Sequence, residues 1–63
     1  MLHLWTWRVS FSSGAPLIRN YTVTAFTRIE AYDRALDMAL GDNAGNILRC
    51  DLIYTNLDEK NGK

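Results

Sequence analysis

The sequence predicts an α+β domain: a three-stranded antiparallel sheet with one helix on one face, in the order β-β-α-β. Three observations lead to this fold class. Two stretches near the start alternate between apolar and polar residues, as half-buried strands do. A capping motif at Thr27 then opens a stretch with helical periodicity, and a third strand-like stretch follows that helix.

The first strand is predicted over residues 2–11, LHLWTWRVSF, because this stretch alternates without interruption. One face would carry His3, Trp5, Trp7, Val9 and Phe11. We expect this aromatic face to form the core, since so small a chain could hardly expose two tryptophans. Residues 12–16 have turn composition, so residues 17–26 should return as the second strand of a hairpin.

The helix is predicted over residues 28–40. Thr27 and Glu30 have the spacing of a capping box, in which each side chain bonds the backbone amide of the other. The residues at helical spacing that should face the sheet are Ile29, Tyr32, Leu36, Ala39 and Leu40, with Ala35 beside them. Gly41 is expected to end the helix in a left-handed conformation.

The third strand is predicted over residues 47–55, ILRCDLIYT, after a polar connection at 42–46. Its inward residues should be Leu48, Cys50, Leu52 and Tyr54. The single domain would span residues 1–56, and the polar stretch 57–63 is expected to fray.

The strand order is expected to be 2-1-3. A right-handed crossover runs the third strand in the direction of the second, so a central first strand makes the sheet antiparallel throughout. The alternative order, 1-2-3, pairs the second and third strands in parallel. It is less favoured because small parallel sheets are usually covered on both faces.

Composition excludes several classes of protein. Seven basic and seven acidic residues give no net charge, unlike a generic basic nucleic-acid binder. One cysteine and one histidine predict no internal disulfide, no metal site and no cofactor. No stretch resembles a signal peptide or a membrane-spanning helix, so we expect a cytoplasmic protein.

No motif in the sequence indicates catalysis. Only His3 and Cys50 could form a nucleophile and base pair on the inward face, and no third group would orient them. A small buried structural thiol is the more ordinary role for Cys50. The sequence therefore predicts a protein that is not an enzyme.

The uncovered sheet face is the predicted docking surface. It should carry Leu4, Thr6, Arg8, Asn20, Thr22, Thr24, Arg49, Asp51 and Ile53. We expect Arg8 and Arg49 to form a small cationic spot on neighbouring strands, and arginine is a frequent interface anchor. The candidate partner-binding residues are Arg8, Thr22, Thr24, Arg49 and Asp51. The alternative is an ordinary solvated face.

The partner is expected to be a larger protein or a second copy. A core of this size is only marginally stabilising, and two edge strands are available for pairing. The alternative is a nucleic-acid-binding dimer that pools Arg8, Arg19, Arg28 and Arg49. It is less favoured because phosphate binding calls for an excess of basic residues.

The order of elements also resembles a known family. The strands around Trp5–Val9 and Tyr21–Phe26, the helix opened by Thr27 and Glu30, and a third strand bearing Arg49 resemble small phage proteins that inhibit bacterial RNA polymerase. The resemblance implies a phage or mobile-element inhibitor or adaptor. It also implies that Arg49 reaches an acidic surface of the polymerase.

Overall fold

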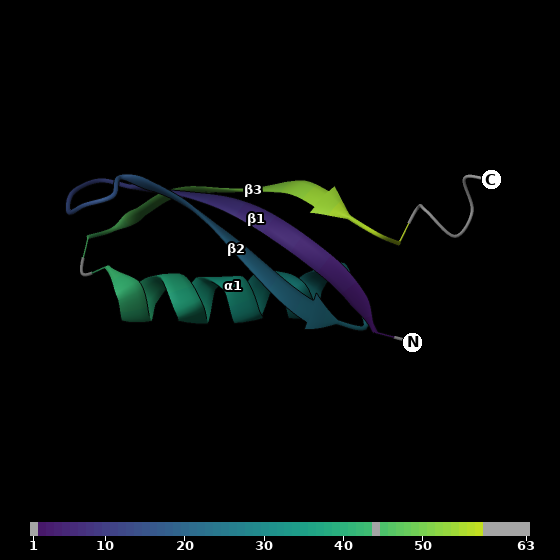
Figure 1. Ribbon diagram of the computed structural model, residues 1–63. Helices are drawn as coiled ribbons and strands as arrows, with labels where there is room; N and C mark the ends of the chain where they lie inside the picture. Colours follow the sequence, from purple (N-terminus) through teal and green to yellow (C-terminus); the bar gives the residue numbers. More distant parts are fainter. Residues whose placement is uncertain (1, 44, 58–63) are drawn as a thin grey trace.

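The protein, in a computed structural model, is described at residues 2–43 and 45–57. In chain order the elements are β1 (His3–Phe11), β2 (Ile18–Ala25), α1 (Arg28–Asp42) and β3 (Ile47–Thr55) (Figure 1). The predicted β-β-α-β order is confirmed, and each strand matches its predicted range to within one residue at either end. The expected frayed tail lies, from residue 58 onward, outside the described residues.

The sheet is antiparallel throughout, and its order β2-β1-β3 confirms the predicted topology. β1 pairs with β2 from His3 opposite Ala25 to Ser10 opposite Ile18. On its other side β1 pairs with β3, from Trp5 opposite Thr55 to Phe11 opposite Ile47. The strand with the most apolar inward face therefore lies in the centre, where it is covered most completely.

The core lies between the sheet and α1. The buried residues of β1 and β2 are the predicted aromatic set and its hairpin partners: Trp5, Trp7, Val9, Phe11, Tyr21, Val23 and Ala25. The indole Nε1 of Trp5 donates to the carbonyl of Ala25 at 3.1 Å, so this buried polar atom is satisfied within the hairpin. Ile47, Cys50 and Leu52 of β3 complete the cluster, but they are only partly buried.

The helix begins with the predicted cap. Thr27 is extended, and its hydroxyl accepts from the amide of Glu30 at 3.2 Å. The carboxylate of Glu30 reaches one residue further back than expected, accepting from the amide of Phe26 at 2.8 Å. Both side chains thus bond backbone amides at the start of the helix, as in a capping box, although the second amide is not that of Thr27.

The predicted C-terminal cap at Gly41 is wrong. The helix continues through Gly41 to Asp42, and the amide of Asn43 still bonds the carbonyl of Ala39 at 3.1 Å. Asp42 accepts a hydrogen bond from Tyr21 of the sheet and lies 3.8 Å from Arg19, so tertiary contacts favour a helix two residues longer than predicted. The described glycine with positive φ is instead Gly14, in the β1–β2 loop.

The helix face that packs on the sheet matches the predicted face only at Ala35 and Ala39. Its buried residues are Ala31, Ala35 and Ala39, all fully inaccessible to solvent. Ile29 and Leu40, expected in the core, are 80% and 61% exposed. The sheet supplies large aromatic side chains, and at interior packing density the facing helix stripe must then be small.

Two irregularities in the β1–β3 pairing change the inward face of β3. Opposite Thr6 and Trp7 lie Tyr54 and Leu52, which leaves Ile53 as an extra residue. A second shift leaves Leu48 extra. Such bulges reset the alternation of side chains. Cys50 and Leu52 face inward as predicted, but Ile47 and Thr55 take the places expected for Leu48 and Tyr54.

Candidate protein-binding surfaces

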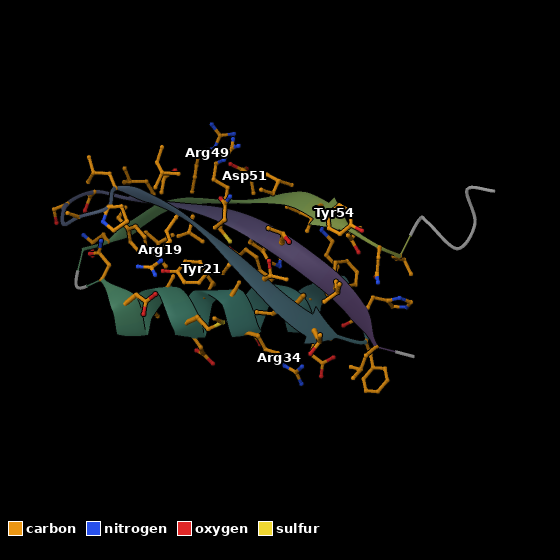
Figure 2. All side chains as sticks on the ribbon, viewed as in Figure 1. Arg19, Tyr21, Arg34, Arg49, Asp51 and Tyr54 are labelled. Atoms are coloured by element: carbon orange, nitrogen blue, oxygen red, sulfur yellow. The ribbon has the colours of Figure 1, made fainter. Side chains whose placement is uncertain are left out.

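The open sheet face brings together all the predicted partner-binding residues. Register pairs Leu4 with Thr24, Thr6 with Thr22, and Arg8 with both Asn20 and Asp51. These pairs lie on the side opposite the buried tryptophans, because side chains alternate along each strand. Figure 2 shows Arg49 and Asp51 on this side of the sheet, pointing away from α1.

The charges on this face do not form the expected cationic spot. Asp51 lies opposite Arg8 in the register and pairs with Arg49 within its own strand, Nε to Oδ2 at 3.0 Å. The Asp51 carboxylate thus offsets the charge of Arg49, and its strand position is the one directly opposite Arg8. Both partners of the pair are well exposed, so it contributes little to stability.

The rest of the open face mixes polar groups with exposed apolar side chains such as Leu4. The hydroxyls of Thr6 and Thr22 bond each other across the strands at 2.9 Å. The carbonyl of Thr24 accepts from the guanidinium of Arg34, which also pairs with Glu30 at 3.3 Å. Tyr54, predicted to face inward, lies opposite Thr6 on this face and adds one half-exposed aromatic ring. Such a mixture is typical of a solvated sheet face.

A second surface, which the sequence did not predict, lies between α1 and β3. The helix packs on β2 and β1, so the inner face of β3 is the least covered part of the sheet. In Figure 1, β3 lies farthest from α1. A pocket of about 220 Å³ opens here, lined by Trp7, Arg28, Ile29, Tyr32 and Cys50.

This pocket, together with the apolar residues on the same flank of α1 and on the inner face of β3, is called here the α1–β3 surface. Its members, from the helix flank and from β3, are Ile29, Tyr32, Leu36, Leu40, Cys50 and Leu52. Helical spacing puts the first four on one side of the alanine stripe. A cluster of exposed leucine, isoleucine and tyrosine is uncommon on a protein that functions without a partner.

Trp7 is the floor of the α1–β3 surface. Its ring contacts that of Tyr32 edge-on, with centroids 5.3 Å apart. Its indole Nε1 is buried and, among the described residues, has no hydrogen-bond partner. An unpaired buried donor of this kind costs roughly 1–3 kcal/mol. The neighbouring Cys50 is half-buried, and burial, followed by the nearby Asp51 carboxylate, raises the pKa of its thiol.

The possible catalytic pair is separated by the fold. His3 lies opposite Ala25 at one end of β1, whereas Cys50 lies opposite Val9. Val9 lies six positions along β1 from His3, a distance of about 20 Å. Among the described residues, no three histidine, cysteine or acidic side chains are grouped as metal ligands would be.

The four arginines considered for nucleic-acid binding do not share a surface. Arg19 lies 3.8 Å from Asp42 and stacks over the ring of Tyr21, 6.0 Å from its centroid. Arg28 lines the α1–β3 pocket, while Arg8 and Arg49 belong to the open face. Paired and spread in this way, they form no basic stripe that could follow a phosphate backbone.

The sequence signal for the α1–β3 surface was present but ambiguous. Ala31, Ala35 and Ala39 recur every four residues, as do Tyr32, Leu36 and Leu40, so two neighbouring stripes compete for the sheet. Hydrophobicity favours the second stripe, whereas close packing against aromatic residues favours the first. Recognising both would have indicated a helix with one buried side and one side left for a partner.

Comparison with known proteins gave no match: no family model, no curated protein and no solved structure is significantly similar to this chain. In the described part of the chain, no helix is both long and apolar enough to cross a membrane.

Proposed function

We propose that this protein is a non-enzymatic binding module, an inhibitor or adaptor that docks on a larger protein through the α1–β3 surface. One observation carries the proposal. The helix directs its alanines at the sheet and leaves larger apolar side chains, such as Ile29 and Leu40, exposed, and Ile29 lines a pocket together with the partly buried Cys50. Aromatic and aliphatic anchors next to a pocket are what a binding partner contacts most productively.

The chemistry of the partner follows from the surface. Its floor is apolar and its pocket is bordered by one cation, Arg28. A segment with apolar side chains and an acidic residue at one end would match both features. The resemblance to phage inhibitors makes a bacterial complex such as RNA polymerase the first partner to test. Nucleic acid is not proposed, because the arginines are paired or dispersed.

The test is a comparison of proteins retained from a bacterial lysate by matched variants. Ile29→Ser with Leu40→Ser removes two exposed anchors of the α1–β3 surface. Met38→Ser is the control, because Met38 is 46% exposed on the same helix but on the other side of the alanine stripe. We expect proteins that wild type and the Met38 variant retain and the double variant loses. Identical retention by all three would contradict the proposal.

The open face is the second candidate surface for the same function. Arg8→Ala and Arg49→Ala test it in the same experiment. If either arginine anchors a partner carboxylate, its loss should weaken binding by roughly 1–3 kcal/mol. If the arginine variants retain less of a lysate protein and the Ile29 and Leu40 double variant does not, the docking site lies on the open face. Retention that falls steeply with salt and depends on nucleic acid would favour the nucleic-acid alternative.

A further inference from the structure

We propose that two copies of the chain pair antiparallel along β3, about a two-fold axis at Cys50, and that the dimer completes the α1–β3 surface as a slot for one helix. The pairing stands on the edge strands and their charges. The slot also depends on the proposed function, because the helix that would fill it belongs to the partner protein proposed above.

The two edges of the sheet are not equally available. At the β2 edge, Arg34 already bonds the carbonyl of Thr24, and a charged side chain over an edge strand discourages pairing. The side-chain hydrogen bonds found near β3 lie at its ends, from the amide of Asn46 to Ser12 and from the amide of Leu57 to Thr55. The bulges at Leu48 and Ile53 bound residues 49–52 of β3, so a regular pairing must be centred within this segment.

Charge selects the centre of the pairing. In an antiparallel strand pair, two residues that lie directly opposite each other point to the same face of the sheet. Because side chains alternate along β3, this holds only if the two-fold axis lies at one residue, which is then opposite its own copy, and not at the bond between two neighbouring residues. An axis at Arg49 or at Asp51 would set like charges opposite each other, which is destabilising. An axis at Cys50 sets Arg49 opposite Asp51 of the partner subunit, twice by symmetry. An axis at Leu52 would instead oppose Asp51 to the bulged Ile53 of the partner subunit.

The dimer explains why so much apolar surface lies beside β3. Its sheet would run β2-β1-β3-β3-β1-β2, with a helix over the outer strands of each half. With strands about 4.8 Å apart, four spacings put the two helix axes about 19 Å from each other. Packed helices are about 8–10 Å apart, so one further helix fits between them. Cys50 and Leu52 form the floor of this slot, and Ile29 and Tyr32 form its walls.

Sedimentation equilibrium of the reduced protein tests the pairing without any partner. We expect a species of twice the 7.2 kDa chain mass. Asp51→Arg and Arg49→Asp should each weaken the dimer about tenfold or more, because two attractive pairs become repulsive. A chain that carries both Arg49→Asp and Asp51→Arg should dimerise again, because the opposed charges are then attractive. A wild-type monomer at high micromolar concentration, or single reversals without effect, would overturn the proposal.

Disulfide formation tests the register. Cross-strand pairs have Cα atoms about 4.5–5.5 Å apart, within reach of a disulfide. Diamide should therefore link wild-type chains through Cys50. In a Cys50→Ser background, chains with Arg49→Cys should link to chains with Asp51→Cys in preference to their own kind. Equal disulfide yields for like and unlike pairs of these variants would overturn the two-fold axis at Cys50.

The slot has its own readout in the lysate experiment. Asp51→Arg should lose the proteins that depend on Ile29 and Leu40, and the exchanged double variant should regain them along with the dimer. If the monomeric variant retains those proteins, the slot is wrong and the proposed function stands. If no protein depends on Ile29 and Leu40, the proposed function fails, while sedimentation still decides the dimer.

Discussion

The phenol of Tyr21 donates a hydrogen bond to Oδ2 of Asp42 at 2.9 Å and so ties the middle of β2 to the last residue of α1. Tyr21 is buried, whereas Asp42 is half-exposed and also lies near Arg19. This contact links the only helix of the described chain to the sheet through a polar group. It also explains why the helix extends past Gly41.

Tyr21→Phe should lower the free energy of unfolding by about 1–2 kcal/mol, because it removes a bond to a charged acceptor while keeping the buried ring. Urea unfolding followed by circular dichroism measures the change. Tyr32→Phe is the control, since its edge-on contact with Trp7 needs only the ring. Equal effects of the two variants would argue against a specific role for the Tyr21–Asp42 bond.

The same contact predicts a loss of stability at high pH. Burial first, and then the bond to the Asp42 carboxylate, raises the pKa of Tyr21 above its usual value near 10. Above that value the unfolded chain releases the phenol proton before the folded chain does, so unfolding becomes more favourable as pH rises. The melting temperature should fall less steeply above about pH 10 in Tyr21→Phe than in wild type. Parallel pH profiles would contradict the prediction.

Two glycines should respond oppositely to alanine. Gly14 has φ of 95°, and a Cβ there would lie 2.7 Å from the side chain of Asn43, so Gly14→Ala should destabilise the fold. Gly41 lies inside the helix with open space around it, so Gly41→Ala should stabilise the fold by about 0.5–1 kcal/mol. Thermal unfolding of both variants checks the pair, and a destabilising Gly41→Ala would contradict the helix boundary.

The helix face can be tested by exchanging residue sizes. Ala35 is fully buried, so Ala35→Leu should overpack the interface and cost about 1–3 kcal/mol. Leu40 is 61% exposed, so Leu40→Ala should change stability by less than about 0.5 kcal/mol. Chemical denaturation of both variants decides between the two faces. The reverse ranking would mean that the predicted leucine stripe packs on the sheet after all.

Replacing the N-cap should weaken the helix. Thr27→Ala removes the acceptor for the Glu30 amide and should cost about 1 kcal/mol. Thr27→Ser keeps the hydroxyl and is the matched control. Unfolding midpoints that do not separate these two variants would show that the cap contributes nothing measurable.

The sequence by itself determined the elements, their order and the composition of the central strand. Period-two alternation over LHLWTWRVSF specified which side chains of β1 face inward, and Thr27 specified where α1 begins. These features depend on neighbours a few residues away in the chain, so local pattern is enough to predict them. The strand order followed as well, because chain direction and crossover handedness left few alternatives.

Only the tertiary structure decided which helix stripe meets the sheet, where β3 shifts its register and where α1 ends. The choice of Ala35 over Leu40 depends on the volume that Trp5, Trp7 and Tyr21 already occupy. The bulges at Leu48 and Ile53 arise from pairing with β1, and the extra residues of α1 are held from β2. All three features are set by residues distant in the chain. The α1–β3 surface results from the choice of helix stripe and from the register shifts of β3.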